Sequence, residues 1–123
     1  MLARDPYLNY VGNPFMRRRP VGARVVAVLH LRNQSRGFDL INARSRVFRQ
    51  MDIGEVIFTE KEDATPGAQV EDAVYFGFIE IERGGCIVAG DEMLWNDKTI
   101  GIVAGFDETH APNHINIVVK CAL

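Results

Sequence analysis

Alternating apolar and polar positions dominate residues 98–120 and predict two β-strands joined by a polar corner. The first strand is expected at residues 99–106 and the second at residues 115–121. A period of two places alternate side chains on the same face of a strand. We therefore expect one core to contain the apolar residues of both strands, namely Ile100, Ile102, Phe106, Ile115, Ile117 and Val119.

The same criterion predicts further strands along the chain. They are expected at residues 21–32, 54–60 and 73–81, and at residues 86–95 with an interruption at Gly90 and Asp91. Turns separate them by composition: Pro66-Gly67 within residues 61–69, Gly84-Gly85 as a tight turn that is compatible with a hairpin, and Asn96-Asp97. These residue types favour turn backbone conformations.

Residues 39–51 have no single period. One set of positions falls near helical spacing behind an acidic residue suited to capping: Asp39, Leu40, Ala43, Val47 and Met51. A second set alternates as in a strand: Arg44, Arg46 and Phe48. We expect a short helix or an irregular strand here.

Residues 1–20 are predicted to form an irregular N-terminal arm. Proline at three positions removes backbone donors and interrupts periodic structure: Pro6, Pro14 and Pro20. The arm carries apolar side chains that can contact the body of the protein or a neighbouring copy: Tyr7, Leu8, Tyr10, Phe15 and Met16. The remainder, residues 21–123, is expected to be one all-β domain, a small β-barrel of six or seven strands.

Length and composition suit a single globular domain, with 123 residues of which 47% are hydrophobic. No apolar run approaches the roughly 18 residues needed to span a membrane, and the first residues lack a secretory apolar segment. Cys86 and Cys121 stand apart in apolar runs. We expect them to be buried free thiols of a cytoplasmic protein, although a disulfide between them stays open.

The net charge of -2 conceals an asymmetry between the two parts of the chain. Residues 1–50 carry ten arginines and two aspartates, a sum of +8, whereas residues 51–123 sum to -10. The two parts can neutralise each other within the domain or across subunits of a homo-oligomer. The alternative is an arginine patch for phosphate, carboxylate or nucleic acid. The acidic pI of 5.9 and the lack of a basic motif interleaved with aromatic residues argue against nucleic acid.

The polar corner, residues 107–114, is the candidate site. Asp107, Glu108, His110 and His114 supply donors for proton transfer or for a metal ion. Two arginines from the first half, Arg44 and Arg46, can complete a wall that binds an anionic small molecule. The alternative is a simple hairpin loop whose polar side chains bond to their own backbone. The sequence identifies neither a cofactor nor a particular metal.

Three segments carry a resemblance to a known family: the glycine turn and short strand of residues 82–95, the alternating strand of residues 98–107, and residues 113–121. Together they resemble the IIA component of the glucitol/sorbitol phosphotransferase system. The resemblance implies a small β-barrel and a phosphoryl group carried on histidine. His114 would match the histidine of the last strand. The strand at residues 75–80, where such a protein would have a histidine, has none, which leaves His110 and His114 as acceptors.

Three functions are compatible with these features. The first is a module that binds a small molecule or a partner and is related to sugar phosphotransfer components. The second is a small enzyme, with or without a metal, that uses the corner at residues 107–114. The third is a phosphocarrier on His114 or His110. A bacterial family of unassigned function that shares only this architecture would give the same sequence pattern.

Overall fold

The computed structural model of the protein describes residues 18–33 and 38–121. Within these ranges the chain forms ten β-strands and no helix, which confirms the all-β class. The strands are β1 (Gly22–Asn33), β2 (Phe38–Asp39), β3 (Ser45–Phe48), β4 (Ile53–Thr59), β5 (Gln69–Val70), β6 (Ala73–Arg83), β7 (Gly85–Val88), β8 (Glu92–Trp95), β9 (Lys98–Asp107) and β10 (Ile115–Lys120). Most of the expected arm, residues 1–17, lies outside the described residues.

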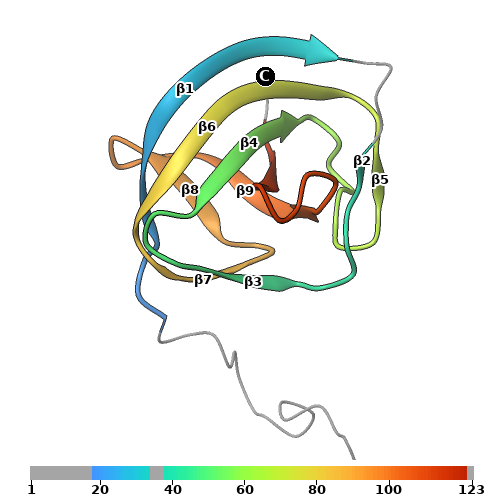
Figure 1. The fold of residues 1–123 in the computed structure, drawn as a ribbon. Coiled ribbons are helices and arrows are strands. Elements are labelled where there is room, and N and C mark those ends of the chain that lie inside the picture. The colour runs from blue at the N-terminus through green and yellow to red at the C-terminus, as the bar shows by residue number, and fades with distance from the viewer. Residues whose placement is uncertain (1–17, 34–37, 122–123) are drawn as a thin grey trace, which may run out of the picture.

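Six strands form the main sheet, in the order β1-β6-β4-β10-β9-β8. The sheet curls into a half-barrel, with β1 and β8 at its two edges (Figure 1). Neighbouring strands are antiparallel except β4 and β10, which run parallel. Two small sheets, β2–β5 and β3–β7, complete the described fold. The barrel expected from the sequence is thus a half-barrel with added short ladders.

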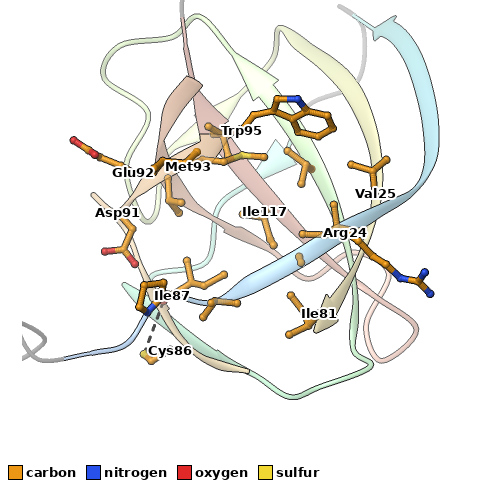
Figure 2. Close-up of a pocket in the computed structure, with 18 of the residues that line it drawn as sticks. Arg24, Val25, Ile81, Cys86, Ile87, Asp91, Glu92, Met93, Trp95 and Ile117 are labelled. Carbon is orange, nitrogen blue, oxygen red and sulfur yellow. Dashed lines mark hydrogen bonds between the residues drawn. The ribbon is translucent and has the colours of Figure 1, made fainter. Parts of the chain in front are cut away.

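One face of the main sheet, here called the inner face, carries the larger apolar cluster. Val56 and Phe58 of β4 alternate with Ile57, and Ile117 of β10 alternates with Val118, so each strand presents a different set of side chains to each face. The inner-face cluster surrounds a cavity, toward which Ile81 and Ile117 point (Figure 2). Its buried members are Phe48, Val56, Phe58, Ile81, Val103, Phe106, Ile115, Ile117 and Val119.

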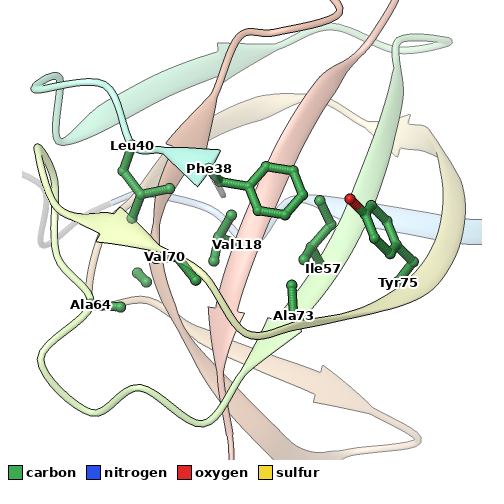
Figure 3. Close-up of a cluster of buried hydrophobic side chains, with 9 residues drawn as sticks. Phe38, Leu40, Ile57, Ala64, Val70, Ala73, Tyr75 and Val118 are labelled. Carbon is green, nitrogen blue, oxygen red and sulfur yellow. The ribbon is translucent and has the colours of Figure 1, made fainter. Parts of the chain in front are cut away.

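A second cluster covers the opposite face of the sheet. Ile57 and Val118, both fully buried, pack there beneath side chains from β2, β5 and the connecting loops (Figure 3). The Phe38 and Tyr75 rings meet edge to face, with centroids 5.7 Å apart. The short β2–β5 ladder therefore serves as a lid on this face, because Phe38 and Val70 lie directly opposite each other in it. The remaining members are Leu40, Ala64, Ala73 and Ala104.

The hairpin with which the Gly84-Gly85 turn is compatible does not form, because the strands on its two sides do not pair with each other. β6 ends at Arg83 and β7 begins at Gly85, but β7 pairs with β3 rather than folding back on β6. A Cβ atom at position 84 would lie 2.7 Å from the carbonyl oxygen of Phe48. Glycine is needed there because the backbone after β3 passes too close for a side chain.

The helical alternative for residues 39–51 is also wrong. Asp39 belongs to β2 and caps no helix, and residues 45–48 form β3, as the alternation of the arginines indicated. Met51 follows in a turn with a positive φ of 77°. Val47 and Met51, which helical spacing would have placed inside, are both exposed.

The core expected from the last two strands is confirmed except at Ile102. Phe106, Ile115, Ile117 and Val119 are buried in the inner-face cluster, and Ile100 packs against it. Ile102 is only half-buried and lies outside that cluster. The register of β9 against β10 shifts between Val119 and Val118, so Val103 replaces Ile102 on the inner face.

The two halves of the chain meet through ion pairs within the molecule. Arg18 pairs with Asp91, Arg24 with Glu80, and Arg46 with Glu108. Intramolecular neutralisation, one of the two arrangements expected from the charge asymmetry, therefore occurs. Both cysteines, Cys86 and Cys121, are free and half-buried, and burial together with the charge of Glu60 raises the pKa of the Cys121 thiol. No helix capable of crossing a membrane occurs among residues 18–33 and 38–121.

Candidate functional site

The polar corner connects the end of β9 at Asp107 to the start of β10 at Ile115. The imidazole rings of His110 and His114 stack, with centroids 5.0 Å apart and planes 28° from parallel. The Ala111–Pro112 peptide between them is cis. The structure thus brings together the two histidines that the sequence selected.

His114 is largely enclosed, with only 10% of its side chain exposed. Its ring meets the Phe78 ring edge to face at 5.1 Å, and its Nδ1 lies 3.1 Å from Nδ2 of Asn113. On the other side, its Nε2 lies 3.5 Å from Oε1 of Glu55 but forms no hydrogen bond of acceptable geometry. An imidazole held between an aromatic ring and a buried carboxylate is positioned by packing rather than by solvent.

Glu55 is the functional candidate that the sequence did not reveal. It lies in β4, and its side chain is 8% exposed. The parallel register places Glu55 opposite Asn116 of β10, and the antiparallel register places Asn116 opposite Asp107 of β9. Three polar side chains therefore lie abreast across three strands. No local sequence signal links residue 55 to residue 116, because that neighbourhood depends on a long-range parallel pairing.

Some of the hydrogen-bonding groups of the row formed by Glu55, Asn116 and Asp107 are paired within the protein. Asn116 Nδ2 donates to Asp107 Oδ1 at 3.1 Å, and the Thr109 backbone N–H donates to the same oxygen at 2.9 Å. Asn116 Oδ1 is buried without a hydrogen-bond partner. Asp107, predicted as a catalytic group, therefore holds the corner in shape, since both of these bonds close the turn.

Glu108 and the two candidate arginines lie nearer to solvent than His114 does. Glu108 is exposed and binds Arg46 through a 2.6 Å ion pair, so Arg46 does reach the corner as expected. Arg44 is exposed just before β3, and its backbone carbonyl accepts a bond from Ala89. In the described part of the chain, no three His, Cys, Asp or Glu side chains converge in a way that suits a metal ion.

A cavity of about 690 Å³ lies on the inner face of the sheet, between the edge strands β1 and β8 (Figure 2). Its floor comes from the inner-face cluster and its rim from the edge strands, β7 and residues 18–21. No corner residue lines it. The lining residues are Arg18, Arg19, Pro20, Val21, Ala23, Arg24, Val25, Val56, Ile79, Ile81, Cys86, Ile87, Asp91, Glu92, Met93, Leu94, Trp95, Asn96, Val103, Ile117 and Val119.

Polar groups at one end of the cavity are firmly paired. Arg18 donates two hydrogen bonds to the Asp91 carboxylate, at 2.6 and 2.7 Å, and a third to the Cys86 carbonyl. Burial alone would raise the pKa of Asp91, but the bonds from Arg18 and the Val88 amide and the charge of Arg18 lower it. The bond to Asp91 in turn raises the pKa of Arg18. This pair fastens the start of the barrel domain to the β7–β8 turn.

Trp95 lines the cavity and is backed by further aromatic rings that do not line it themselves. Trp95 of β8 contacts Phe76 of β6 edge to face, with centroids 5.8 Å apart, and Phe76 contacts Phe58 in the same manner at 5.4 Å. Trp95 remains 46% exposed, so one side of the indole faces solvent at the rim. The cavity is therefore an apolar site with a tryptophan at its entrance, a composition typical of ligand pockets.

The cavity and the corner occupy opposite faces of the same sheet. Val56 and Ile117 line the cavity, while their chain neighbours Glu55 and Asn116 point away from it. A ligand in the cavity therefore does not contact the stacked histidines through these strands. The two candidate sites are separate.

A comparison with protein-family models matches residues 15–122 to a family of unknown function, DUF6917. The chain belongs to the DUF6917 family. Neither the curated proteins nor the solved structures gave a match to the chain. The features of this DUF6917 member that bear on function are the cavity and the corner. The likeness to glucitol/sorbitol IIA components stays an expectation drawn from sequence patterns.

Proposed function

We propose that this DUF6917 protein is a binding module whose ligand site is the inner-face cavity. The observation that carries the proposal is the cavity itself, about 690 Å³ with an apolar floor. That volume falls within the roughly 300–1,000 Å³ range of pockets that enclose small ligands. Taking up an apolar group there removes its surface from water at about 25 cal/mol per Å².

Binding is favoured over chemistry because the cavity lacks a reactive arrangement. The charged groups of Arg18 and Asp91 are joined by two hydrogen bonds. This pairing leaves neither group positioned to transfer a proton to or from a ligand. The enzyme and phosphocarrier functions depend on the corner instead. There His114 is nine-tenths buried, which limits contact with a donor protein or substrate.

Trp95, the only tryptophan in the chain, gives a direct test. We would titrate the protein with N-phenyl-1-naphthylamine, a neutral apolar fluorophore, and follow both probe emission and Trp95 quenching. A saturable one-to-one curve is expected. Ala23→Phe should weaken it, because residue 23 lines the cavity, whereas Ala27→Phe on the same strand should not. Equal effects of the two variants, or no saturable binding, would refute the cavity as the ligand site.

Phosphoryl transfer is kept as a second candidate because the His110–His114 stack presents two imidazoles at one corner. The test is incubation with a phosphohistidine donor protein, followed by detection of acid-labile phosphate. Label that is lost in His110→Ala or His114→Ala would favour this candidate over a binding module. The Lys98→Ala variant serves as a control, since Lys98 is exposed and starts β9, at the opposite end of the strand from the corner.

A further inference from the structure

The cavity lies between two strand edges that have no partner strand within residues 18–33 and 38–121. β1 pairs only with β6, and β8 pairs only with β9. Residues 23–25 of β1 and 92–95 of β8 both line the cavity. A free edge presents a row of backbone N–H and C=O groups. An occupant that covers these edges must bond to them, because burying unpaired backbone groups is costly.

The strand pairings fix the relative direction of the two edges. β1 is antiparallel to β6, β6 to β4, β10 to β9 and β9 to β8, while β4 and β10 are parallel. Counting the reversals shows that β1 and β8 run in the same direction. A strand placed between them can therefore be antiparallel to both, which is the commoner and slightly more stable kind of pairing.

Side chains around the cavity suit a strand with alternating character. The floor is aliphatic, with Val56, Ile79 and Ile117 among its members. Arg24 donates to Glu80 at 3.0 Å, and Figure 2 shows Arg24 and Glu92 directed away from the cavity. An occupant thus meets apolar groups inward and charges or solvent outward. This is the environment of every second residue in a half-buried strand.

The two ends of the cavity limit the length of such a strand. The Arg18–Asp91 pair closes one end, and the Trp95–Phe76 contact lies toward the other. β8 itself has four residues. At about 3.3 Å per residue, the edge it offers is roughly 13 Å long, which corresponds to a short segment rather than a domain.

We propose that the occupant is an extended peptide segment of a partner protein, with apolar residues at alternate positions, that adds a strand between β1 and β8. It runs antiparallel to both edges and completes the half-barrel. Main-chain hydrogen bonds supply affinity, and the apolar floor selects the inward side chains. This inference rests on the proposed function, because it uses the same cavity.

The test uses the full chain and a panel of blocked hexapeptides that alternate threonine with valine, leucine or phenylalanine. Each peptide has a matched control that is N-methylated at alternate amides, which keeps the side chains but blocks one hydrogen-bonding edge. Binding is followed by Trp95 fluorescence, and amide hydrogen exchange is followed by NMR. We expect a plain peptide to bind and to protect amides of both β1 and β8. Its methylated control should bind roughly tenfold more weakly, equivalent to about 1.4 kcal/mol.

Failures of the two proposals are distinguishable. Equal binding of the plain and methylated peptides would overturn strand addition. So would saturable uptake of N-phenyl-1-naphthylamine with no peptide bound at about 1 mM, the weak end of specific association. In both cases the cavity would still be a ligand site. Failure of both the fluorophore and the peptides would overturn the proposed function as well.

Discussion

At the scale of single residues, buried and half-buried polar groups hold the molecule together at two points. Arg18 and Asp91 join the first described residues to the β7–β8 turn through two parallel hydrogen bonds. Paired arginine and carboxylate groups in this geometry are stronger than neutral hydrogen bonds. Asp107 and Asn116 similarly join the end of β9 to β10. Each pair can be tested by substitution.

The Arg18–Asp91 pair predicts a specific dependence of stability on pH. The folded-state pKa of Asp91 lies below its ordinary value of 3.8, so the unfolded chain binds protons more readily. The stabilisation is therefore present above pH 3.8 and is lost as the pH falls through the folded-state value. Asp91→Asn should flatten the stability curve in that acid range, as measured by urea unfolding at a series of pH values. The exposed Glu82→Gln variant is the control; an unchanged slope in Asp91→Asn would contradict the prediction.

The Asp107–Asn116 bond predicts energetic coupling between two strands. Asp107→Ala and Asn116→Ala should each lower the free energy of unfolding by about 1–3 kcal/mol, because each leaves the other side chain buried without this hydrogen-bond partner. The double variant should cost less than the sum by roughly 0.5–3 kcal/mol. Thr109→Ala is the control, since Thr109 contributes its backbone N–H to Asp107. Strict additivity in urea unfolding would show that the bond contributes nothing.

At the scale of elements, the local sequence pattern predicts where most strands lie but not which strands pair with each other. Period-two alternation predicts β9 and β10, and the composition of Asn96-Asp97 predicts a turn, in which both residues have positive φ, at 49° and 65°. The pairing of β7 with β3 was missed because glycines at a strand end fit either a hairpin or a close backbone crossing. Glu55 and the cavity were missed for a related reason. Their neighbours come from strands far apart in the chain.

The bulge in β9 predicts unequal costs for two similar substitutions. Ile117→Ala removes a side chain that is 4% exposed in the inner-face cluster, so it should cost about 2–5 kcal/mol. Ile102→Ala removes a half-buried side chain outside that cluster and should cost roughly 1 kcal/mol. Denaturant midpoints of the two variants give the comparison. Equal losses would mean that the register shift does not separate their environments.

At the scale of the whole molecule, three ion pairs among residues 18–33 and 38–121 join the arginine-rich and acidic parts of one chain. The sequence also predicts a homo-oligomer in which residues 1–20 take part. Light scattering should therefore report a mass above the 13.8 kDa of one chain. Added salt should lower that mass, because it screens contacts between exposed charges. A monomer at high protein concentration and low salt would contradict this expectation.

The parallel pairing of β4 with β10 has a consequence for how the chain folds. Gly54 lies opposite Ile115, so this pairing joins residues 61 positions apart, and β10 alone connects the β1-β6-β4 half of the sheet to the β9-β8 half. The chain loses the conformational entropy of closing so long a loop before the contacts between β4 and β10 stabilise it. We expect refolding in the range of milliseconds to seconds, typical of non-local β topologies. Stopped-flow refolding of Val118→Ala, which alters the centre of β10, would show whether this docking step is complete in the transition state.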